Sequence, residues 1–336
     1  MEVDQLHRQL TMPVSDHTQI GQVRRAAVAL SNQMGLDETT QGKLAIIATE
    51  MASNIVKHAG RGEVVLRALR DEGPGIEALA IDRGPGMADP DACLRDGFST
   101  AGSAGTGLGA MSRLSDTFDI YSYPDKGTVV MARVWKSGGP INPSCQVGSI
   151  CLPMGSEQLP GDAWAVDVEP GRLLVTVIDG LGHGAAAAIA AEKALQIFRE
   201  HHAETPEQIL GKAHEALHDT RGATMAVAEV FMGRQQLEYC GIGNIYGAVV
   251  APSRSRSLVS LNGTVGHELR KLRAFTYPYP AGALLIMHSD GLSTRWSLDD
   301  YPGIFQHHPA IAAAVLYRDH SRQRDDVAVL AVRYRP

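Results

Sequence analysis

The sequence lacks the features that mark secreted and membrane proteins. Its cysteines form no CxxC pair and no metal-ligand spacing, which favours a reducing compartment over a disulfide framework; they are Cys93, Cys145, Cys151 and Cys240. No apolar run reaches the roughly 18 residues that span a bilayer. The first residues also lack the basic and apolar regions of a signal peptide. We therefore expect a soluble, cytoplasmic protein.

Neither half of the chain carries an excess of positive charge. The formal net charge is −6, and the first 136 residues contain 14 basic and 17 acidic side chains, so each half carries about −3. This balance argues against binding to nucleic acid or to an anionic membrane. The chain has 336 residues, of which 44% are hydrophobic, so it contains enough core material for two domains of ordinary size.

One segment rich in Gly, Pro and Ser divides the chain. It reads Lys136-Ser-Gly-Gly-Pro-Ile-Asn-Pro-Ser144 and follows an apolar strand, which is typical of a linker. We therefore expect a first domain over residues 1–136, a linker over 137–145 and a second domain over 146–336. Because the linker is short, the two domains are expected to touch or to face a common partner.

The first domain alternates helical and strand patterns. Helices are predicted over 17–34 and 37–59, the second capped by Asp37. Its buried face is predicted from apolar spacing, as Leu44, Ile47, Met51, Ile55 and His58. Strands are predicted over 64–69, 76–81, 117–123 and 128–135. This order favours an α+β sandwich with helices on one face of a sheet.

Glu50 and Asn54 lie four residues apart on the second helix, so they share one face. A carboxylate and a carboxamide in this arrangement can activate a hydroxyl group and bind Mg²⁺. The alternative is an ordinary solvated polar face.

A second motif begins where a strand ends in Asp82 and enters the turn Gly84-Pro-Gly86. The carboxylate can accept a hydrogen bond from an exocyclic amine, although Asp in such a turn often has only a structural role. A third motif is the glycine-rich run over residues 97–110, which leads into a helix. Its backbone N–H groups suit an anion. The run matches neither a Walker A loop nor a Rossmann fingerprint, and a flexible loop is the alternative.

Taken together and in this order, the three motifs resemble the GHKL (Bergerat) ATPase fold, and within it the anti-sigma-type serine kinases of the RsbW and RsbT kind. Residues 48–60 are similar to the N-box, 82–87 to the adenine box and 105–110 to the phosphate box. The resemblance implies Glu50 as general base, Asn54 as Mg²⁺ ligand and Asp82 as the partner of the adenine amine. It also places in the ATP site Gly84, Gly86, Gly102, Gly105, Thr106, Gly107, Leu108 and Gly109.

The second domain contains a hairpin that brings two carboxylates together. Strands over 162–168 and 172–178 flank the turn Glu169-Pro-Gly-Arg172. If the turn is centred on its Pro-Gly bond, Asp162 faces Asp179, with their Cβ atoms about 4.5–5.5 Å apart. Two such carboxylates repel each other unless a cation lies between them.

Two more acidic residues occur at strand ends. Asp290 follows an apolar strand, and Asp325 precedes the last strand. Four carboxylates without Cys or His ligand spacing indicate hard ions such as Mg²⁺ or Mn²⁺. A pair of these ions can lower the pKa of a water and hold a phosphoryl group. The alternatives are a turn residue for Asp290 and a strand cap for Asp325.

Residues 146–334 resemble the metal-dependent protein phosphatases (PPM) of the SpoIIE and RsbX type, on the pattern Pro-Gly-Asp162, Asp179-Gly-Leu-Gly-His-Gly184, Ser-Asp290-Gly and Asp325-Asp326. The resemblance implies a β-sandwich flanked by helices and two Mn²⁺ or Mg²⁺ ions. Asp179 would bridge the ions, with Asp162 and the Gly180 carbonyl on one and Asp290 and Asp325 on the other. Catalysis is then assigned to Asp162 and Asp179, through water attack on phosphoserine. No arginine is identified by motif as a phosphate-binding residue, and His201-His202 and His307-His308 are expected to be surface pairs.

The two resemblances imply a partner-switching regulator. The first domain would phosphorylate, with ATP and Mg²⁺, a serine of STAS-domain proteins of the stressosome or anti-anti-sigma type, and the second would remove the phosphate. In the alternative, only the second domain is catalytic, and the first binds ATP or a partner and regulates it.

Overall fold

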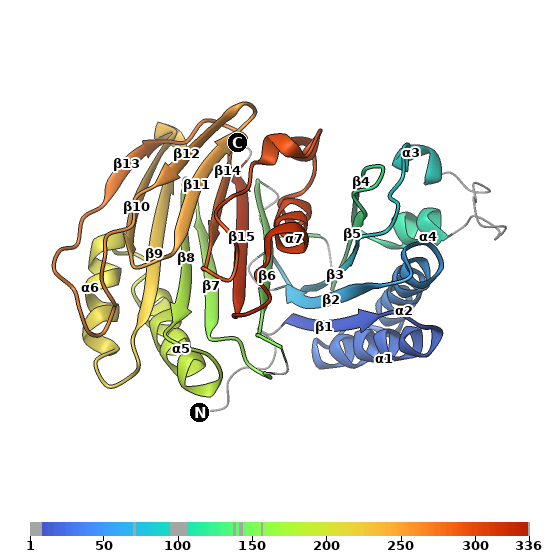
Figure 1. Ribbon diagram of the computed structural model, residues 1–336, viewed down its shortest axis with the longest axis horizontal. Coiled ribbons are helices and arrows are strands. Elements are labelled where there is room, and N and C mark those ends of the chain that lie inside the picture. Colours follow the sequence, from blue (N-terminus) through green and yellow to red (C-terminus); the bar gives the residue numbers. More distant parts are fainter. Residues whose placement is uncertain are drawn as a thin grey trace. The chain divides into compact units, whose positions relative to one another are not determined.

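The computed structural model describes residues 9–69, 72–94, 107–136, 139–140, 144–155 and 157–334 (Figure 1). The chain forms two compact units. The first contains residues 1–143 and 306–318, and the second contains 144–305 and 319–336. Most of the expected linker, residues 137–138 and 141–143, lies outside the described residues. Residues 306–318 come from the expected second domain but pack within the first unit.

The first unit is built on a five-stranded antiparallel sheet in the order β1-β2-β3-β5-β4. Its strands are β1 (Gln9–Val14), β2 (Gly62–Leu69), β3 (Gly75–Asp82), β4 (Thr117–Ser122) and β5 (Thr128–Trp135). The four predicted strands are confirmed. Strand β1 was not predicted, because it is a short edge strand that contains Pro13.

Helices α1 (His17–Gln33) and α2 (Glu38–Asn54) pack against one face of this sheet. Asp37 caps α2 as predicted and accepts a hydrogen bond from the backbone N–H of Thr40. A π-helical turn, Ile55–Ala59, continues α2. This turn changes the helical period, so His58 is exposed, contrary to its predicted burial. The short α3 (Pro90–Cys93) and α4 (Gly107–Leu114) complete this layer.

The other face of the sheet carries helix α7 (Pro309–His320). Side chains alternate along β2, so Glu63 points away from its neighbour Val64, which packs against α1 and α2. The Tyr317 hydroxyl of α7 donates to the Glu63 carboxylate at 3.3 Å. The prediction of helices on one face is therefore incomplete, because a helix from far along the chain covers the second face.

The start of α7 is bound to β4. The Asp119 carboxylate accepts from the His307 ring at 2.8 Å and from the backbone N–H of His308 at 2.6 Å. His308 is only 8% exposed, so the expected surface position of this histidine is wrong. Asp119 satisfies an N–H group at the beginning of the helix, where no intrahelical acceptor exists. Helix α7 thus crosses the sheet from β4 to β2.

Charged side chains also lie buried on this second face. Arg67, Glu77 and Arg133 stand directly opposite one another on β2, β3 and β5. The Glu77 carboxylate lies 3.1 Å from the Arg67 guanidinium and 2.6 Å from that of Arg133, and its residue is fully buried. Burial alone would raise the pKa of Glu77, but the two arginines outweigh it and lower that pKa.

The second unit is a sandwich of two antiparallel sheets, β13-β10-β9-β8-β7 and β12-β11-β14-β15-β6. The strands are β6 (Cys145–Leu152), β7 (Asp162–Glu169), β8 (Arg172–Gly180), β9 (Ala223–Phe231), β10 (Gln236–Ile242), β11 (Tyr246–Ala251), β12 (Arg254–Leu258), β13 (Phe275–Pro278), β14 (Leu284–His288) and β15 (Val327–Tyr334). Val175, Val177, Leu285 and Leu330 belong to the core between the sheets.

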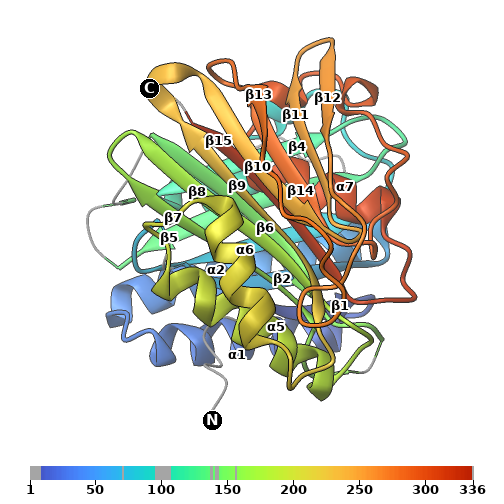
Figure 2. The same ribbon diagram turned by 90° about the vertical axis from the view of Figure 1, so that its left-hand side faces the viewer.

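Helices α5 (Ala185–Glu200) and α6 (Pro206–Ala216) cover the outer face of the first of these sheets (Figure 2). The predicted sandwich flanked by helices is therefore confirmed. Short 3-10 turns occur at Met232–Arg234, Leu298–Asp300 and Ile304–Gln306. None of the helices in the described part of the chain combines the length and apolar character needed to span a membrane.

Replacing Glu77 by Gln should strongly destabilise the protein, because two buried arginines then lose a charged partner. We expect the free energy of unfolding to fall by about 3–5 kcal/mol, measured by urea titration with circular dichroism. Asp125→Asn is the control, since Asp125 is an exposed turn residue of the same unit. Equal stability of the two variants would show that the buried ion pairs contribute nothing.

Candidate functional site

A cavity of 460 Å³ in the first unit brings together residues of two of the three predicted nucleotide motifs and of the last part of the third. It is lined mainly by apolar side chains, with Asp82 and Asn54 among its few polar groups. The lining includes Met51, Ile55, Met87, Met111 and Val130. Gly86 and Gly107 also line it, as does Leu108, whereas Gly102, Gly105 and Thr106 lie outside the described residues. Its apolar walls, with the carboxylates of Asp82 and Asp89 among them, suit a flat heterocycle with an exocyclic amine.

Asp82 has one carboxylate oxygen engaged by the protein. Its Oδ1 accepts from the backbone N–H of Gly84 at 2.8 Å and from that of Thr128 at 3.2 Å. Burial raises the pKa of Asp82, while these two hydrogen bonds oppose the shift. The hydrogen bonds fix the orientation of the carboxylate, so its other oxygen can accept from a ligand. A side chain at Gly86 would be strained, because its φ is +69°.

Glu50 and Asn54 lie together beside the first turn of α4. A methyl group built on Gly107 would approach a Glu50 carboxylate oxygen to 2.6 Å and the Asn54 amide oxygen to 3.7 Å. Only glycine therefore fits at Gly107 without displacing Glu50. The predicted shared face of these two residues is confirmed, and it is directed at the start of the glycine-rich helix. Gly109, two residues after Gly107, is buried in the first turn of this helix.

In the second unit, β7 and β8 pair in the predicted register, with Asp162 opposite Asp179. Burial and the neighbouring Asp179 raise the pKa of Asp162 well above its usual range. Burial and the carboxylates of Asp290 and Asp325 raise the pKa of Asp179 to about 7. These shifts record carboxylates held close together without a compensating positive charge.

Asp290 and Asp325 come from two other strands of the unit. Burial and Asp325 raise the pKa of Asp290, while Arg322 and the hydrogen bond from Asn244 oppose the shift. Asn244 donates to Asp290 at 2.8 Å and accepts from the Thr224 hydroxyl at 2.6 Å. Thr224 in turn faces Asp179 across β8 and β9, so Asn244 connects the two acidic strand ends. The Gly180 residue follows Asp179 at the end of β8.

Sequence reasoning missed three residues that organise this site. Asn244 is one of them. Ser289 donates to the Asp162 carboxylate at 2.5 Å, and Asp326 accepts at 2.6 Å from the backbone N–H groups of both Met154 and Gly161. Ser289 and Asp326 are each adjacent in sequence to a predicted metal ligand, and this adjacency could have identified them as site residues from the sequence. Asn244 could be found only from its position in the fold.

The donor set fits hard divalent cations, because it consists of carboxylates from four strand ends with one backbone carbonyl nearby. In the described residues no three of these carboxylates have oxygen atoms within 4.8 Å of one another. A spread of this kind suits ligands shared between two ions about 3.5–4 Å apart rather than one ion held by all four.

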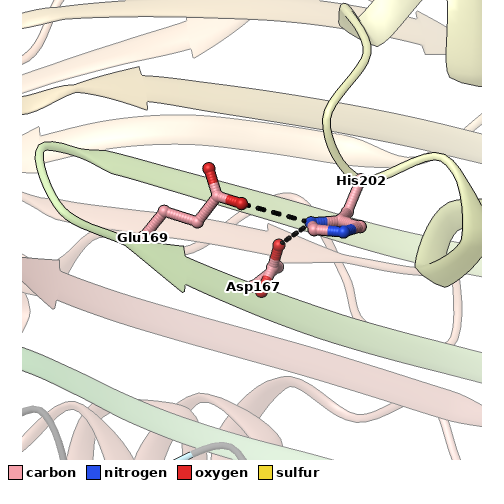
Figure 3. A group of neighbouring side chains, drawn as sticks. All are labelled: Asp167, Glu169 and His202. Atoms are coloured by element: carbon pink, nitrogen blue, oxygen red, sulfur yellow. Dashed lines mark hydrogen bonds and ion pairs between the residues drawn. The ribbon is translucent and has the colours of Figure 1, made fainter.

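Asp167, Glu169 and His202 form a separate group that does meet the 4.8 Å separation (Figure 3). The His202 ring lies 2.6 Å from Asp167 and 3.4 Å from Glu169. The Arg172 guanidinium lies 3.6 Å from Glu169, so this carboxylate already has a positively charged partner from the protein. Glu169 ends the strand that Asp162 begins, roughly 23 Å away at ~3.3 Å per residue. This group is therefore an ion-pair cluster remote from the four aspartates.

Comparison with known proteins assigns each unit to a family. The histidine kinase-like ATPase domain family matches residues 14–134, and the stage II sporulation protein E (SpoIIE) family matches residues 169–335. The serine/threonine-protein kinase RsbT of Bacillus subtilis (strain 168) is 34% identical over 107 residues, which cover 32% of this chain and 80% of RsbT.

The phosphoserine phosphatase RsbX of the same organism is 27% identical over 134 residues, 40% of this chain and 67% of RsbX. A solved chain from the bacterial stressosome, described as a modular system adapted to control secondary messenger signaling, is 26% identical with a TM-score of 0.53. It covers 56% of this chain and 99% of its own length. The chain therefore belongs to the histidine kinase-like ATPase family of RsbT through its first unit and carries a SpoIIE-type phosphatase domain in its second.

Proposed function

We propose that this protein is a bifunctional partner-switching enzyme acting on one class of protein substrate. The first unit transfers the γ-phosphoryl group of ATP to a serine hydroxyl, forming phosphoserine and ADP. The second unit hydrolyses phosphoserine with water, forming serine and inorganic phosphate. The observation that carries this proposal is that both sets of chemical groups are assembled in one chain, each beside the glycines that allow close approach of a ligand.

In the kinase reaction, Asp82 selects adenine through its free carboxylate oxygen, since the other oxygen is occupied by backbone N–H groups. Glu50 would accept the serine proton as the hydroxyl attacks. Asn54 would hold Mg²⁺ on the phosphates. The relative RsbT, a serine/threonine-protein kinase, supports this assignment.

In the phosphatase reaction, Asp162, Asp179, Asp290 and Asp325, together with the Gly180 carbonyl, would hold two Mn²⁺ or Mg²⁺ ions. Such ions supply a water of lowered pKa and neutralise phosphate charge. The chain itself keeps Asp162 oriented through Ser289 and Asp290 through Asn244. The relative RsbX is a phosphoserine phosphatase, which supports phosphoserine as the substrate.

We further propose STAS-domain proteins of the stressosome or anti-anti-sigma type as the partners. Support comes from the likeness to RsbT, to RsbX and to a stressosome chain. Nucleic acid is a poor candidate, because neither half of the chain is basic.

The two activities are separable by mutation. With labelled ATP and a STAS-domain protein, Glu50→Gln should lower phosphoryl transfer by ~10²-fold or more while nucleotide binding persists. Asp179→Asn should leave transfer intact and stop release of labelled phosphate. The measurement is radiolabel on the protein and in free phosphate. Normal transfer by Glu50→Gln would refute the kinase assignment, and normal release by Asp179→Asn would refute the phosphatase site.

The acidic site should make the metal-free protein sensitive to pH. The folded-state pKa of Asp179, about 7, lies above the usual value for an unfolded Asp. Its contribution to stability is therefore complete at low pH and is lost as pH rises through about 7. We expect the Tm of the metal-free protein to be several degrees lower at pH 8 than at pH 6, by scanning calorimetry, because about 1 kcal/mol moves the Tm by about 2–4 °C.

Added Mn²⁺ should remove most of this difference, and so should Asp179→Asn. Asp300→Asn, which changes an exposed carboxylate of the same unit, should retain it. If Asp179→Asn keeps the full pH dependence, Asp179 is not its source.

A second candidate function, in which the first unit binds nucleotide and regulates the phosphatase, is favoured by helix α7. The chain enters the first unit after Phe305 and leaves it after Arg318. This excursion lies between Asp290 and Asp325, two of the proposed metal ligands. Within the first unit, the Arg318 guanidinium donates to the backbone carbonyl of Asp82 at 3.5 Å. A residue of the proposed nucleotide cavity thus binds a helix that is joined to strand β15 of the second unit by residues 321–326.

This regulation predicts a phosphatase rate that changes at least about twofold with nucleotide, the effect of a few tenths of a kcal/mol. Asp119→Ala removes the acceptor at the start of α7 and should abolish the change without affecting nucleotide binding. Asp116→Ala is the control, because Asp116 binds the backbone N–H of Trp135 and not α7. Hydrolysis of p-nitrophenyl phosphate with and without ATP measures the effect. An equal response in both variants would exclude α7 as the link.

A further inference from the structure

Four carboxylates concentrate negative charge at the phosphatase site, which raises the question of what attracts a phosphate dianion there. Bound ions would neutralise part of this charge. Known strategies for phosphate recognition add an arginine, whose planar guanidinium can donate two parallel hydrogen bonds to phosphate oxygens. No sequence motif identifies such an arginine in this chain.

Arg221 lies beside the loop that follows Asp179. Strands β8 and β9 pair Asp179 with Thr224 and Gly180 with Ala223. The ladder continues with a hydrogen bond from the Leu181 N–H to the Gly222 carbonyl at 3.0 Å. The next step of this register places Arg221 opposite Gly182. The backbone alone therefore brings Arg221 to the loop at the acidic site.

The side chain of Arg221 also lies at this loop, near Gly182. A methyl group built on Gly182 would lie 3.0 Å from an Arg221 guanidinium nitrogen. Gly182 has a φ of +86°, a conformation that favours glycine. A larger residue at this position would thus be strained and would also meet the guanidinium. The loop leaves space for Arg221 within three residues of Asp179.

Arg221 is exposed, and within the described residues it takes part in no hydrogen bond and no salt bridge. Arg322, in contrast, acts on the site's own carboxylates, since its charge lowers the pKa of Asp290 against the effect of burial. The guanidinium of Arg221 keeps its donors available for a ligand. An unpaired cation at the loop that follows Asp179 is suited to a ligand that is itself anionic.

We propose that Arg221 binds the phosphate group of the substrate in the phosphatase site. The inference rests on the proposed phosphatase function and adds the residue that recognises the phosphomonoester dianion. Arg221 would hold two phosphate oxygens while the phosphorus faces the carboxylate cluster. It would also bind the product, inorganic phosphate, in the same way.

Binding of inorganic phosphate tests this role independently of catalysis. In the presence of Mg²⁺, phosphate should raise the Tm of the full chain, and Arg221→Ala should weaken its Kd by roughly 10- to 100-fold. Arg221→Lys should recover part of the affinity, because it keeps the charge but loses the paired donors. Mg²⁺ affinity, from calorimetric titration, should stay within about twofold of wild type.

Arg322→Ala and Arg254→Ala are the matched controls. Arg254 is an exposed arginine that pairs with Ala251, at the end of β11 opposite to the end that follows Asn244. Its loss should change neither phosphate affinity nor Mg²⁺ affinity. Loss of Arg322 should alter Mg²⁺ affinity more than phosphate affinity. For p-nitrophenyl phosphate, kcat/KM of Arg221→Ala should fall by the same factor as phosphate affinity.

Two results would overturn the role of Arg221. One is unchanged phosphate affinity in Arg221→Ala. The other is an equal loss of Mg²⁺ affinity, which would make Arg221 a support of the Gly180–Gly182 loop. A wild-type protein that binds phosphate through Arg221 but hydrolyses no phosphomonoester would contradict the proposed function and leave the binding role intact.

Discussion

The repulsion between Asp162 and Asp179 is the constraint on which the second unit depends. A strand pair that places two carboxylates face to face is unfavourable on its own. The surrounding structure compensates at this point. Ser289, at the end of β14, donates to Asp162 and accepts from the backbone N–H of Ala328 in β15. Asp326, just before β15, accepts from Gly161 immediately before Asp162. The two sheets are therefore joined by hydrogen bonds at the end where the carboxylates gather, and this joining keeps the acidic residues together against their repulsion.

The first unit also contains buried charges, but there each charge is paired with one of opposite sign. Charges on the second face of its sheet are buried, but Glu77 lies between Arg67 and Arg133 at register positions on three adjacent strands. A second buried acid, Glu72, lies 2.8 Å from Arg133. Each charge has a partner of opposite sign, so the network needs no ion from solution. The contrast indicates different uses of buried charge. Balanced charges in the first unit hold a sheet together, whereas unbalanced charges in the second leave binding energy available for cations.

Local patterns predicted much of the fold and of both candidate sites. The Glu169-Pro-Gly-Arg172 turn determined the register that pairs Asp162 with Asp179, because a strand pair has only one register once its turn is placed. Helical spacing placed Glu50 and Asn54 on one face. The prediction that His58 is buried was wrong because this residue lies within a π-helical turn, which changes the helical period. Helix α7 has an ordinary apolar pattern, which does not predict the element against which the helix packs. Its position depends on Asp119, almost 190 residues earlier in the sequence. Arg221 carries no motif and becomes visible only when β8 and β9 are paired.

The bifunctional activity that we propose would require the two reactions to be coordinated, because otherwise ATP would be hydrolysed without a lasting product. The connectivity of this chain offers a physical route for such coordination. Segment 306–318 is bound at its start by Asp119 and at its end by Glu63 and Asp82, all within the first unit. The covalent chain then reaches Asp325 seven residues after Arg318. Any change in the nucleotide cavity that moves the Asp82 backbone must either break its hydrogen bond to Arg318 or move the end of α7. In the second case α7 moves at the end from which the chain continues to Asp325, so the covalent chain offers a route by which the proposed nucleotide site could influence the proposed metal site.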